Sequence, residues 1–217
     1  MHEPAAPSDP HDCQQPQTRR GIERRLALLL SATELFLQNG YDAVSLDDIV
    51  QHAGGSKTSI YKYFGNKDGL FTAICDYRRE LFFQDICIPF DGKNIDLRRY
   101  LINTLISFYQ HIRQPQNMAF MRLVIEQSQR NPNLALYLHQ KGPQYIQHTI
   151  ATALSKAHEQ GQLDCPNPLY SAMMFFSILR NYEWCIIMAI EVPCDDQEVI
   201  NYLTYCIDLF LKGHQKA

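Results

Sequence analysis

The sequence predicts an all-α protein in two parts: an N-terminal three-helix domain of the helix-turn-helix type and a larger C-terminal helical bundle. Only 10 of the 217 residues are Gly, and hydrophobic residues make up 46% of the chain, which is enough for a packed core. Most β-branched residues stand among Leu, Ala, Gln and Met, which favour helices over strands. Apolar residues recur at helical spacing, and Gly and Pro punctuate the intervals.

The N-terminal end and the cysteines indicate where the protein works. Residues 1–18 are expected to form a disordered arm, because they contain four prolines among mostly polar residues. They include no apolar segment typical of a secretory signal, and no run of 18 apolar residues occurs that could span a membrane. Seven cysteines without a C-x-x-C pair are typical of buried thiols in a reducing compartment. A redox pair of Cys185 and Cys194 is the open alternative. We therefore expect a cytoplasmic protein with no membrane partner.

Four helices are expected in the N-terminal part. Gly40 ends the first of them. Ser45, followed three residues later by Asp48, forms a capping box that starts the second. Gly54 and Gly55 separate the second helix from the third. The expected ranges are 19–39, 46–53, 57–64 and 67–83.

Six further helices are expected in the C-terminal part. The segment 86–95 contains Pro89 and Asp91-Gly92, which makes it a loop and a domain boundary. Later prolines stand at the first residue of a helix or just after its end. The expected helices cover residues 96–113, 116–129, 132–140, 143–160, 168–190 and 195–212. This pattern predicts a helix-turn-helix domain, a linking helix and a second domain at residues 19–71, 67–83 and 84–217.

The helix expected over residues 57–64 has side chains that suit the major groove of DNA. Ile60 and Phe64, four residues apart, are its inward anchors. Its remaining surface offers lysines, hydroxyls and phenols and no acid, in Lys57, Thr58, Ser59, Tyr61, Lys62 and Tyr63. Such groups hydrogen-bond base edges and phosphates. The open alternative is a small helical bundle with no role in DNA binding.

The net charge of the chain does not favour the binding of this helix to DNA. The formal net charge is −3, so the molecule as a whole is not a basic nucleic-acid binder. Locally, the basic residues form two groups, Arg19, Arg20, Arg24 and Arg25, then Lys57, Lys62 and Lys67. DNA affinity would therefore rest on these groups and on dimerisation.

The last two expected helices have the composition of a subunit interface. In residues 169–190 apolar side chains occupy nearly every side, which indicates burial on more than one face. The final helix carries an apolar stripe of Val199, Tyr202, Leu203, Cys206, Leu209 and Phe210. Two helices from each subunit would form a four-helix dimer interface. The alternative is that both helices fill the core of a monomer.

The N-terminal part resembles the TetR/AcrR family of transcriptional regulators. Residues 25–71 carry L-L-x-S-A-x-x-L-F-x-x-x-G-Y, then S-L-D-D-I-V-x-x-A-G, then S-K-x-x-I-Y-x-Y-F-x-N-K-x-x-L. Further on, R-L-V-I-E-Q-S-Q-R-N-P-N-L at residues 122–134 resembles the AefR-type C-terminal domain. One departure is Gly55, which stands where the family often has an apolar β-branched residue. We expect it to loosen the turn by up to about 1 kcal/mol.

The resemblance implies a homodimer that binds a palindromic double-stranded operator in two successive major grooves, with half-sites roughly 34–36 Å apart. It also implies a repressor that is released when a small-molecule effector binds the larger domain. The residues that would reach bases are Lys57, Thr58, Ser59 and Tyr61. Phosphates would be held by Ser45, Ser56, Tyr63 and Lys67, with Arg24 and Arg25 as weaker candidates. Lys62 completes the DNA-binding set.

The same resemblance places an effector cavity inside the bundle of residues 96–190. The candidate lining residues are Phe108, Phe120, Met121, Glu126, Tyr145, Phe176, Tyr182, Glu183 and Trp184. The apolar ones are otherwise ordinary core residues. Glu126 and Glu183 fall within strongly apolar helices, where a carboxylate without a partner is costly to bury. We hypothesise that one of them faces the cavity and selects a cationic or hydrogen-bonding ligand.

No pattern indicates catalysis. The chain contains no H-E-x-x-H, no G-x-S-x-G and no Gly-rich phosphate loop, so we expect neither an enzyme nor a cofactor or metal site. Two other functions remain open: a ligand-binding helical dimer without DNA binding, and a transcriptional activator of the same fold. An enzyme built on a helical bundle is the more remote alternative.

Overall fold

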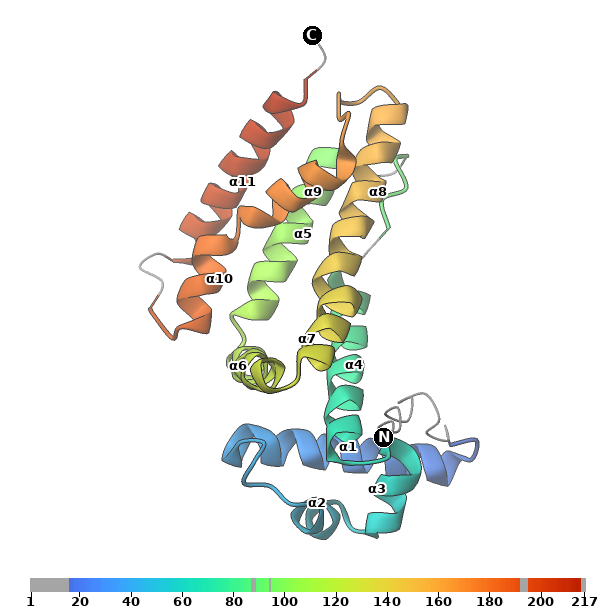
Figure 1. Ribbon diagram of the computed structural model, residues 1–217. Helices are drawn as coiled ribbons and strands as arrows, with labels where there is room; N and C mark the ends of the chain where they lie inside the picture. Colours follow the sequence, from blue (N-terminus) through green and yellow to red (C-terminus); the bar gives the residue numbers. More distant parts are fainter. Residues whose placement is uncertain (1–15, 87–88, 94, 192–194, 216–217) are drawn as a thin grey trace, which may run out of the picture. The chain divides into compact units, whose positions relative to one another are not determined.

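The computed structural model describes residues 16–86, 89–93, 95–191 and 195–215, and every regular element among them is a helix (Figure 1). The chain divides into two compact units, one ending at Arg78 and the other beginning at Arg79. Most of the arm expected at residues 1–18 lies outside the described residues, and so does Cys194. None of the described helices combines the length and the apolar character needed to cross a bilayer.

The first unit contains the expected helix-turn-helix arrangement. Thr18 caps its first helix by accepting a hydrogen bond from the Gly21 amide. The capping box of Ser45 and Asp48 forms at the start of the second helix, and Gly65 follows the third with a φ of 75°. The elements are α1 (Arg19–Asn39), α2 (Leu46–Ala53), α3 (Lys57–Phe64) and the beginning of α4 (Lys67–Ile86). The expected bounds are confirmed for the first three, and α4 ends three residues later than expected.

An aromatic group packs the start of α4 against the end of α1. The rings of Phe36, Tyr41 and Phe71 lie 5.1 to 6.1 Å apart, centroid to centroid. The Tyr41 hydroxyl donates to the Asp68 carboxylate. Burial, and then the neighbouring Asp68, raise the pKa of Tyr41 far above its ordinary range, so the phenol keeps its proton. Around this group the side chains buried in the first unit include Leu28, Leu29, Ala32, Ile49, Ile60, Phe64, Leu70 and Ile74.

The second unit is a bundle of antiparallel and crossing helices. Its elements are α5 (Leu97–Ile112), α6 (Pro115–Arg130), α7 (Pro132–His139), η2 (Gln140–Gln144), α8 (Tyr145–Glu159), α9 (Pro168–Ser177), α10 (Arg180–Ile187) and α11 (Asp196–Gly213). Helix α8 packs along α9, and α11 packs along α5. Their shared core is formed by side chains such as Leu101, Leu105, Leu154, Phe175, Leu203 and Ile207.

Two expected boundaries in this unit are wrong. We expected a break before Pro143, but a π-helical turn, η2, carries the chain from α7 into α8. The wider turn accommodates a proline, which has no N–H to donate. We also expected one helix over residues 168–190, but it divides into α9 and α10. The amides of Ile178 and Leu179 bond to carbonyls three residues back, and this tighter turn seats Leu179, 1% exposed, in the core.

Candidate nucleic-acid interface

Helix α3 is held on one face and presents the other. Ile60 and Phe64 are buried, at 0% and 4% exposure. Directly opposite them on the helix lie Thr58 and Lys62, and both are exposed. Two turns of helix are too short to be stable alone, so this packing is what keeps α3 folded. The inward residues therefore decide which residues face outward.

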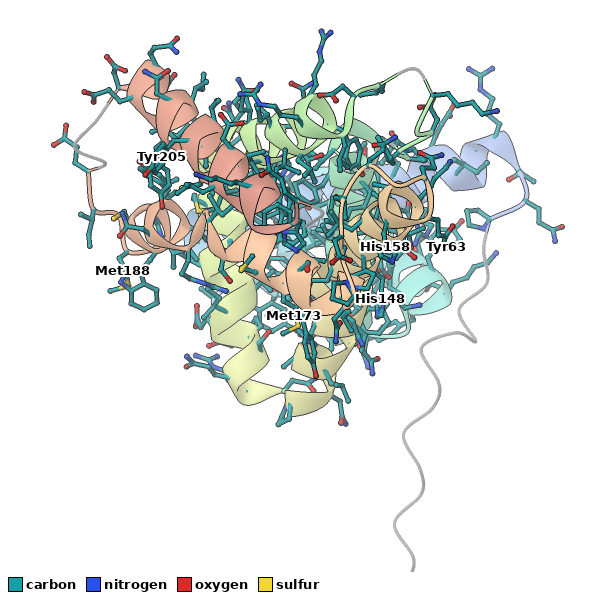
Figure 2. The ribbon with its side chains drawn as sticks, turned by 90° about the horizontal axis from the view of Figure 1, so that it is seen from above. Tyr63, His148, His158, Met173, Met188 and Tyr205 are labelled. Atoms are coloured by element: carbon teal, nitrogen blue, oxygen red, sulfur yellow. The ribbon has the colours of Figure 1, made fainter. Side chains whose placement is uncertain are left out.

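The candidate base-reading residues differ in exposure. Lys57 and Thr58 are exposed, and Tyr61 has 54% of its surface accessible. Ser59 is half-buried, and so is Tyr63, which Figure 2 labels on α3. The exposed set offers a hydroxyl, a phenol and an ammonium group at the N-terminal half of a helix that has no acid in its first turn. These groups match the donors and acceptors of base edges.

Both α3 lysines have contacts within the unit. The Lys57 Nζ lies 2.8 Å from Asp47 Oδ2, and this hydrogen bond raises the pKa of Lys57. Lys62 Nζ lies 5.7 Å from the centroid of the Tyr63 ring. Since Lys57, Asp47 and Lys62 are exposed, both lysines remain within reach of a phosphate.

The predicted phosphate contacts serve a second purpose in the fold. The Ser45 hydroxyl caps the N-terminus of α2. The Lys67 Nζ donates to the backbone carbonyl of Tyr41 and lies over the ring of the same residue. Burial lowers the pKa of Lys67. The guanidinium of Arg25 stacks on Phe64, with Cζ 5.1 Å from the centroid. Ser56 is exposed at the N-cap position of α3 without a side-chain cap bond. Of the predicted phosphate residues, Ser56 is thus the least occupied by structural contacts.

Arg24 reaches the turn between α2 and α3. Its Nη1 donates to the carbonyls of Ala53 and Gly54, although these residues lie 29 and 30 positions away in the sequence. The expected loosening of the turn at Gly55 also needs revision. Gly55 has a φ of 136°, which disfavours any residue with a side chain. Periodicity gave no signal for either feature.

The predicted effector residues lie in different environments. Phe120 is buried, and Phe108, Phe176 and Tyr182 are partly buried. Met121, Tyr145 and Trp184 are exposed, with 38%, 52% and 57% of their surfaces accessible. Two surface grooves of the second unit are lined by other residues, among them Arg113, Pro115, Met118 and Arg122. Neither of these two grooves is lined by any of the nine candidates.

Neither Glu126 nor Glu183 is a buried carboxylate without a partner, and the hypothesis that one of them selects a ligand stays a prediction. Glu126 pairs with Arg130 across one turn at 3.0 Å, and both side chains are about half exposed. Glu183 pairs with Arg180 at 3.3 Å, and 26% of its side chain is accessible. Both arginines stand on the same helix as their partner, so each carboxylate is compensated locally. Apolar neighbours in the sequence did not reveal this pairing.

A buried amide on α6 was missed. Gln127 is 7% exposed, and its Nε2 has no hydrogen-bond partner among the residues that the structure describes. A buried donor without an acceptor is costly, and such groups mark a bound water or a binding site. The described residues contain no group of three or more His, Cys, Asp or Glu side chains suited to a metal ion.

Comparison with known families agrees with this geometry. A model described as bacterial regulatory proteins of the tetR family matches residues 28–74, which include the helix-turn-helix unit. A second, the C-terminal domain of AefR-like transcriptional repressors, matches residues 99–215, more than half of the chain. The chain belongs to the TetR family of transcriptional regulators. The resemblance seen in the sequence is thereby confirmed, as is the all-helical fold with an N-terminal helix-turn-helix domain.

Several similar proteins match this chain over most of its length. A putative TetR-family regulator from Mesorhizobium loti superposes with a TM-score of 0.82 at 20% identity, over 92% of this chain and 100% of that one. The flavonoid-responsive regulator FrrA gives a TM-score of 0.77 at 24% identity, over 89% and 98%. YezE of Bacillus subtilis, an uncharacterised regulator, is 26% identical over 71% of this chain and 80% of its own.

Two relatives of higher identity match over a shorter stretch. ComR of Escherichia coli, a transcriptional repressor, is 46% identical over 52 residues, which are 24% of this chain and 25% of ComR. The activator FasR of Mycolicibacterium smegmatis is 42% identical over 52 residues. The chain therefore matches only about a quarter of the length of these two relatives.

Proposed function

We propose that the protein binds a palindromic operator as a homodimer and represses transcription until a small-molecule effector releases it. The observation that carries this proposal is the outward face of α3, where Lys57, Thr58, Tyr61 and Lys62 are exposed without an acid among them. The family supports DNA binding as the use of this face. The match of the C-terminal part to the AefR-like repressor domain favours repression over activation.

In this proposal some residues of α3 contact bases and others contact phosphates. Thr58 and Tyr61 would read base edges, and Ser59 and Lys57 would do so from the flanks. Ser56, Lys62 and the α3 N-terminus would hold phosphates, which fix the register on the duplex. The backbone contacts would be supported from positions that the fold also uses, namely Ser45, Tyr63, Lys67, Arg24 and Arg25.

The experiment is footprinting of the DNA upstream of the gene and its neighbours. Phosphate contacts make binding strongly salt-dependent, so protection is measured at several salt concentrations below ~200 mM. We expect two protected half-sites about one helical turn apart. The triple variant Thr58→Ala, Tyr61→Ala, Lys62→Ala is the matched control and should give no footprint. Absence of protection with the wild-type protein at every salt concentration would leave a ligand-binding helical dimer as the better proposal.

Dimerisation is assigned to the last three helices of the second unit. These helices expose an unusual number of large apolar side chains: Tyr170, Met173, Met174, Trp184, Met188, Tyr202, Tyr205 and Leu209. Figure 2 labels three of them, Met173, Met188 and Tyr205, one on or next to each helix. Exposed apolar patches of this kind mark protein interfaces, and a second copy of this chain is the partner that the family supports.

We infer an aromatic effector for the second unit. Three partly buried rings, one each from α4, α5 and α9, form a row. The ring centroid of Phe82 lies 5.4 Å from that of Phe108, which lies 6.0 Å from that of Phe176. Such rings favour stacking with a flat ligand. Gln127 would supply one hydrogen-bond donor to an oxygen of the ligand. Because FrrA is named as flavonoid-responsive, phenolic compounds are a suitable first panel, and release of the protein from its operator is the measurement.

A further inference from the structure

The turn between α2 and α3 is closed by a residue from a different helix. The last carbonyls of a helix have no partner within it. At the end of α2, Nη1 of Arg24 donates to the carbonyl of Ala53 at 3.3 Å and to that of Gly54. A cation at this end of a helix also interacts favourably with the helix dipole. Arg24 lies on α1, so one side chain ties α1 to the C-terminal end of α2, just before the turn into α3.

Gly55 makes room for this contact. A Cβ atom on Gly55 would lie 2.9 Å from Nη1 of Arg24 and 3.2 Å from its Cζ, closer than such atoms normally approach. The φ of 136° at Gly55 is itself unfavourable for any residue with a side chain. The backbone conformation therefore favours glycine, and a side chain at this position would in addition displace the guanidinium of Arg24. The sequence led us to expect a loosened turn, but Arg24 holds this turn through the carbonyls of Ala53 and Gly54.

At this end of α3, Lys57 pairs with Asp47 of α2, but the N-cap position lacks a side-chain bond. Ser56 occupies its N-cap position, but the side chain makes no cap hydrogen bond and is 3.4 Å from the Ser59 hydroxyl. The path of the chain into α3 is thus set by Gly54 and Gly55 and by what holds them. Because α3 carries the exposed recognition residues, a shift of this turn would move all of them at once.

We propose that Arg24 is a positioning residue, and that the pair of Arg24 and Gly55 fixes the orientation of α3 on DNA. This inference rests on the proposed DNA binding. It replaces the expectation that Arg24 is mainly a phosphate contact. Arg24 acts through the turn, so its loss should affect the choice between DNA sequences as well as the affinity.

The two roles predict different salt dependence. A phosphate contact contributes about 1 to the slope of log affinity against log salt concentration, and its loss weakens all sequences alike. Loss of a positioning residue leaves the salt slope unchanged and narrows the difference in affinity between operator and unrelated DNA. Lysine also separates the roles, since it keeps the charge for a phosphate, but its ammonium nitrogen lies one bond closer to the backbone than Nη1 of Arg24, which donates to both carbonyls.

The experiment measures binding of Arg24→Met and Arg24→Lys to the footprinted operator and to an unrelated duplex, by fluorescence anisotropy at four salt concentrations. We expect both variants to lose roughly tenfold in operator affinity, the effect of one charge-assisted hydrogen bond. Their salt slope should equal that of the wild type, and their affinity for unrelated DNA should be unchanged. The control is Arg99→Met, an exposed arginine of α5. Circular dichroism at the assay temperature verifies that each variant is folded.

A double variant tests the pairing. Gly55→Ala alone should weaken operator binding through backbone strain and through displacement of Arg24. In Arg24→Met, Gly55→Ala the second effect is absent, so the combined loss should be at least threefold smaller than the product of the single losses, roughly 0.6 kcal/mol or more of coupling.

Three results would overturn the inference: a salt slope reduced by about 1, full binding by Arg24→Lys, or independent effects of the two substitutions. If the wild-type protein fails to bind any DNA, the proposed function fails instead, and the two failures are distinguishable.

Discussion

At the scale of single residues, Gln127 gives the sharpest test of the effector site. Its buried Nε2 has no acceptor among the described residues. In Gln127→Leu, which has a similar size, the unsatisfied donor is removed. We therefore expect the effector-free protein to be more stable by about 1–3 kcal/mol, measured by chemical denaturation. A substitution of a buried polar group that stabilises is uncommon, which makes the result informative.

The same variant should respond less to the effector. Loss of one hydrogen bond corresponds to about a fivefold higher effector concentration for half-release from the operator. Operator affinity without effector should be unchanged. If Gln127→Leu is destabilised and responds normally, the amide has a structural acceptor and no part in effector binding.

On α3, lysine and hydroxyl substitutions should have separable effects. We expect Lys62→Ala to weaken binding to all sequences about equally and to lower the salt slope by about 1. Thr58→Val keeps the shape and removes the hydroxyl, so it should cost operator affinity alone, by about 1–3 kcal/mol if it bonds a base. Titrations with operator and unrelated DNA measure both, and Lys141→Ala, an exposed lysine of η2, is the control. Equal behaviour of the two variants would contradict this division of roles.

The sequence allowed the outward face of α3 to be predicted, because Ile60 and Phe64 fix it by helical spacing alone. Arg24 could not be assigned in this way, since its partners lie 29 and 30 residues away. The pairing of Glu126 and Glu183 with nearby arginines was readable from spacing, but the apolar surroundings outweighed it. Contacts across sequence distance depend on packing, which periodicity does not describe.

At the scale of elements, helix bounds were predictable where caps define them. Helices α1, α2 and α3 begin and end as expected, because Thr18, Ser45 and the glycines at 40, 54 and 65 are local signals. The division between α9 and α10 has no Gly or Pro to mark it. There the burial of Leu179 decides the path, and that is a tertiary effect.

The capping box of α2 should make the thermal stability of the protein depend on pH. Hydrogen bonds from the Ser45 hydroxyl and amide lower the pKa of Asp48, so the bonded carboxylate stabilises the folded unit above the ordinary aspartate pKa and this contribution is lost as pH falls below about 4. We expect Ser45→Ala to lower the melting temperature by about 2–4 °C at pH 7. The difference from wild type should shrink as the pH falls toward 3.

Thermal melts between pH 3 and pH 7 measure this effect. Ser56→Ala is the matched control, because Ser56 makes no cap bond and its loss should leave the melting temperature unchanged. A constant difference between Ser45→Ala and wild type across the pH range would mean that the Asp48 carboxylate adds nothing to the cap.

At the scale of the whole molecule, two-fold symmetry is what would turn a short recognition helix into a specific regulator. One α3 offers few base contacts, and the net charge of −3 gives no general attraction to DNA. Two copies linked through α9, α10 and α11 would double the contacts and set the spacing of the half-sites. The apolar composition of these helices was evident in the sequence, whereas which of their side chains remain exposed required the structure.

Dimerisation and DNA binding should therefore fail together when a charge is placed in the proposed interface. Tyr205, on α11, has 63% of its surface exposed, and a charge at that position would be buried in a dimer without a partner. We expect Tyr205→Glu to sediment as a monomer at micromolar concentration and to lose at least about a hundredfold in operator affinity, since each half-site is then bound independently. Leu136→Glu, on α7, is the control, because Leu136 is 57% exposed outside these helices. A Tyr205→Glu protein that remains dimeric would move the interface elsewhere, and a monomer with full operator affinity would remove dimerisation from the mechanism.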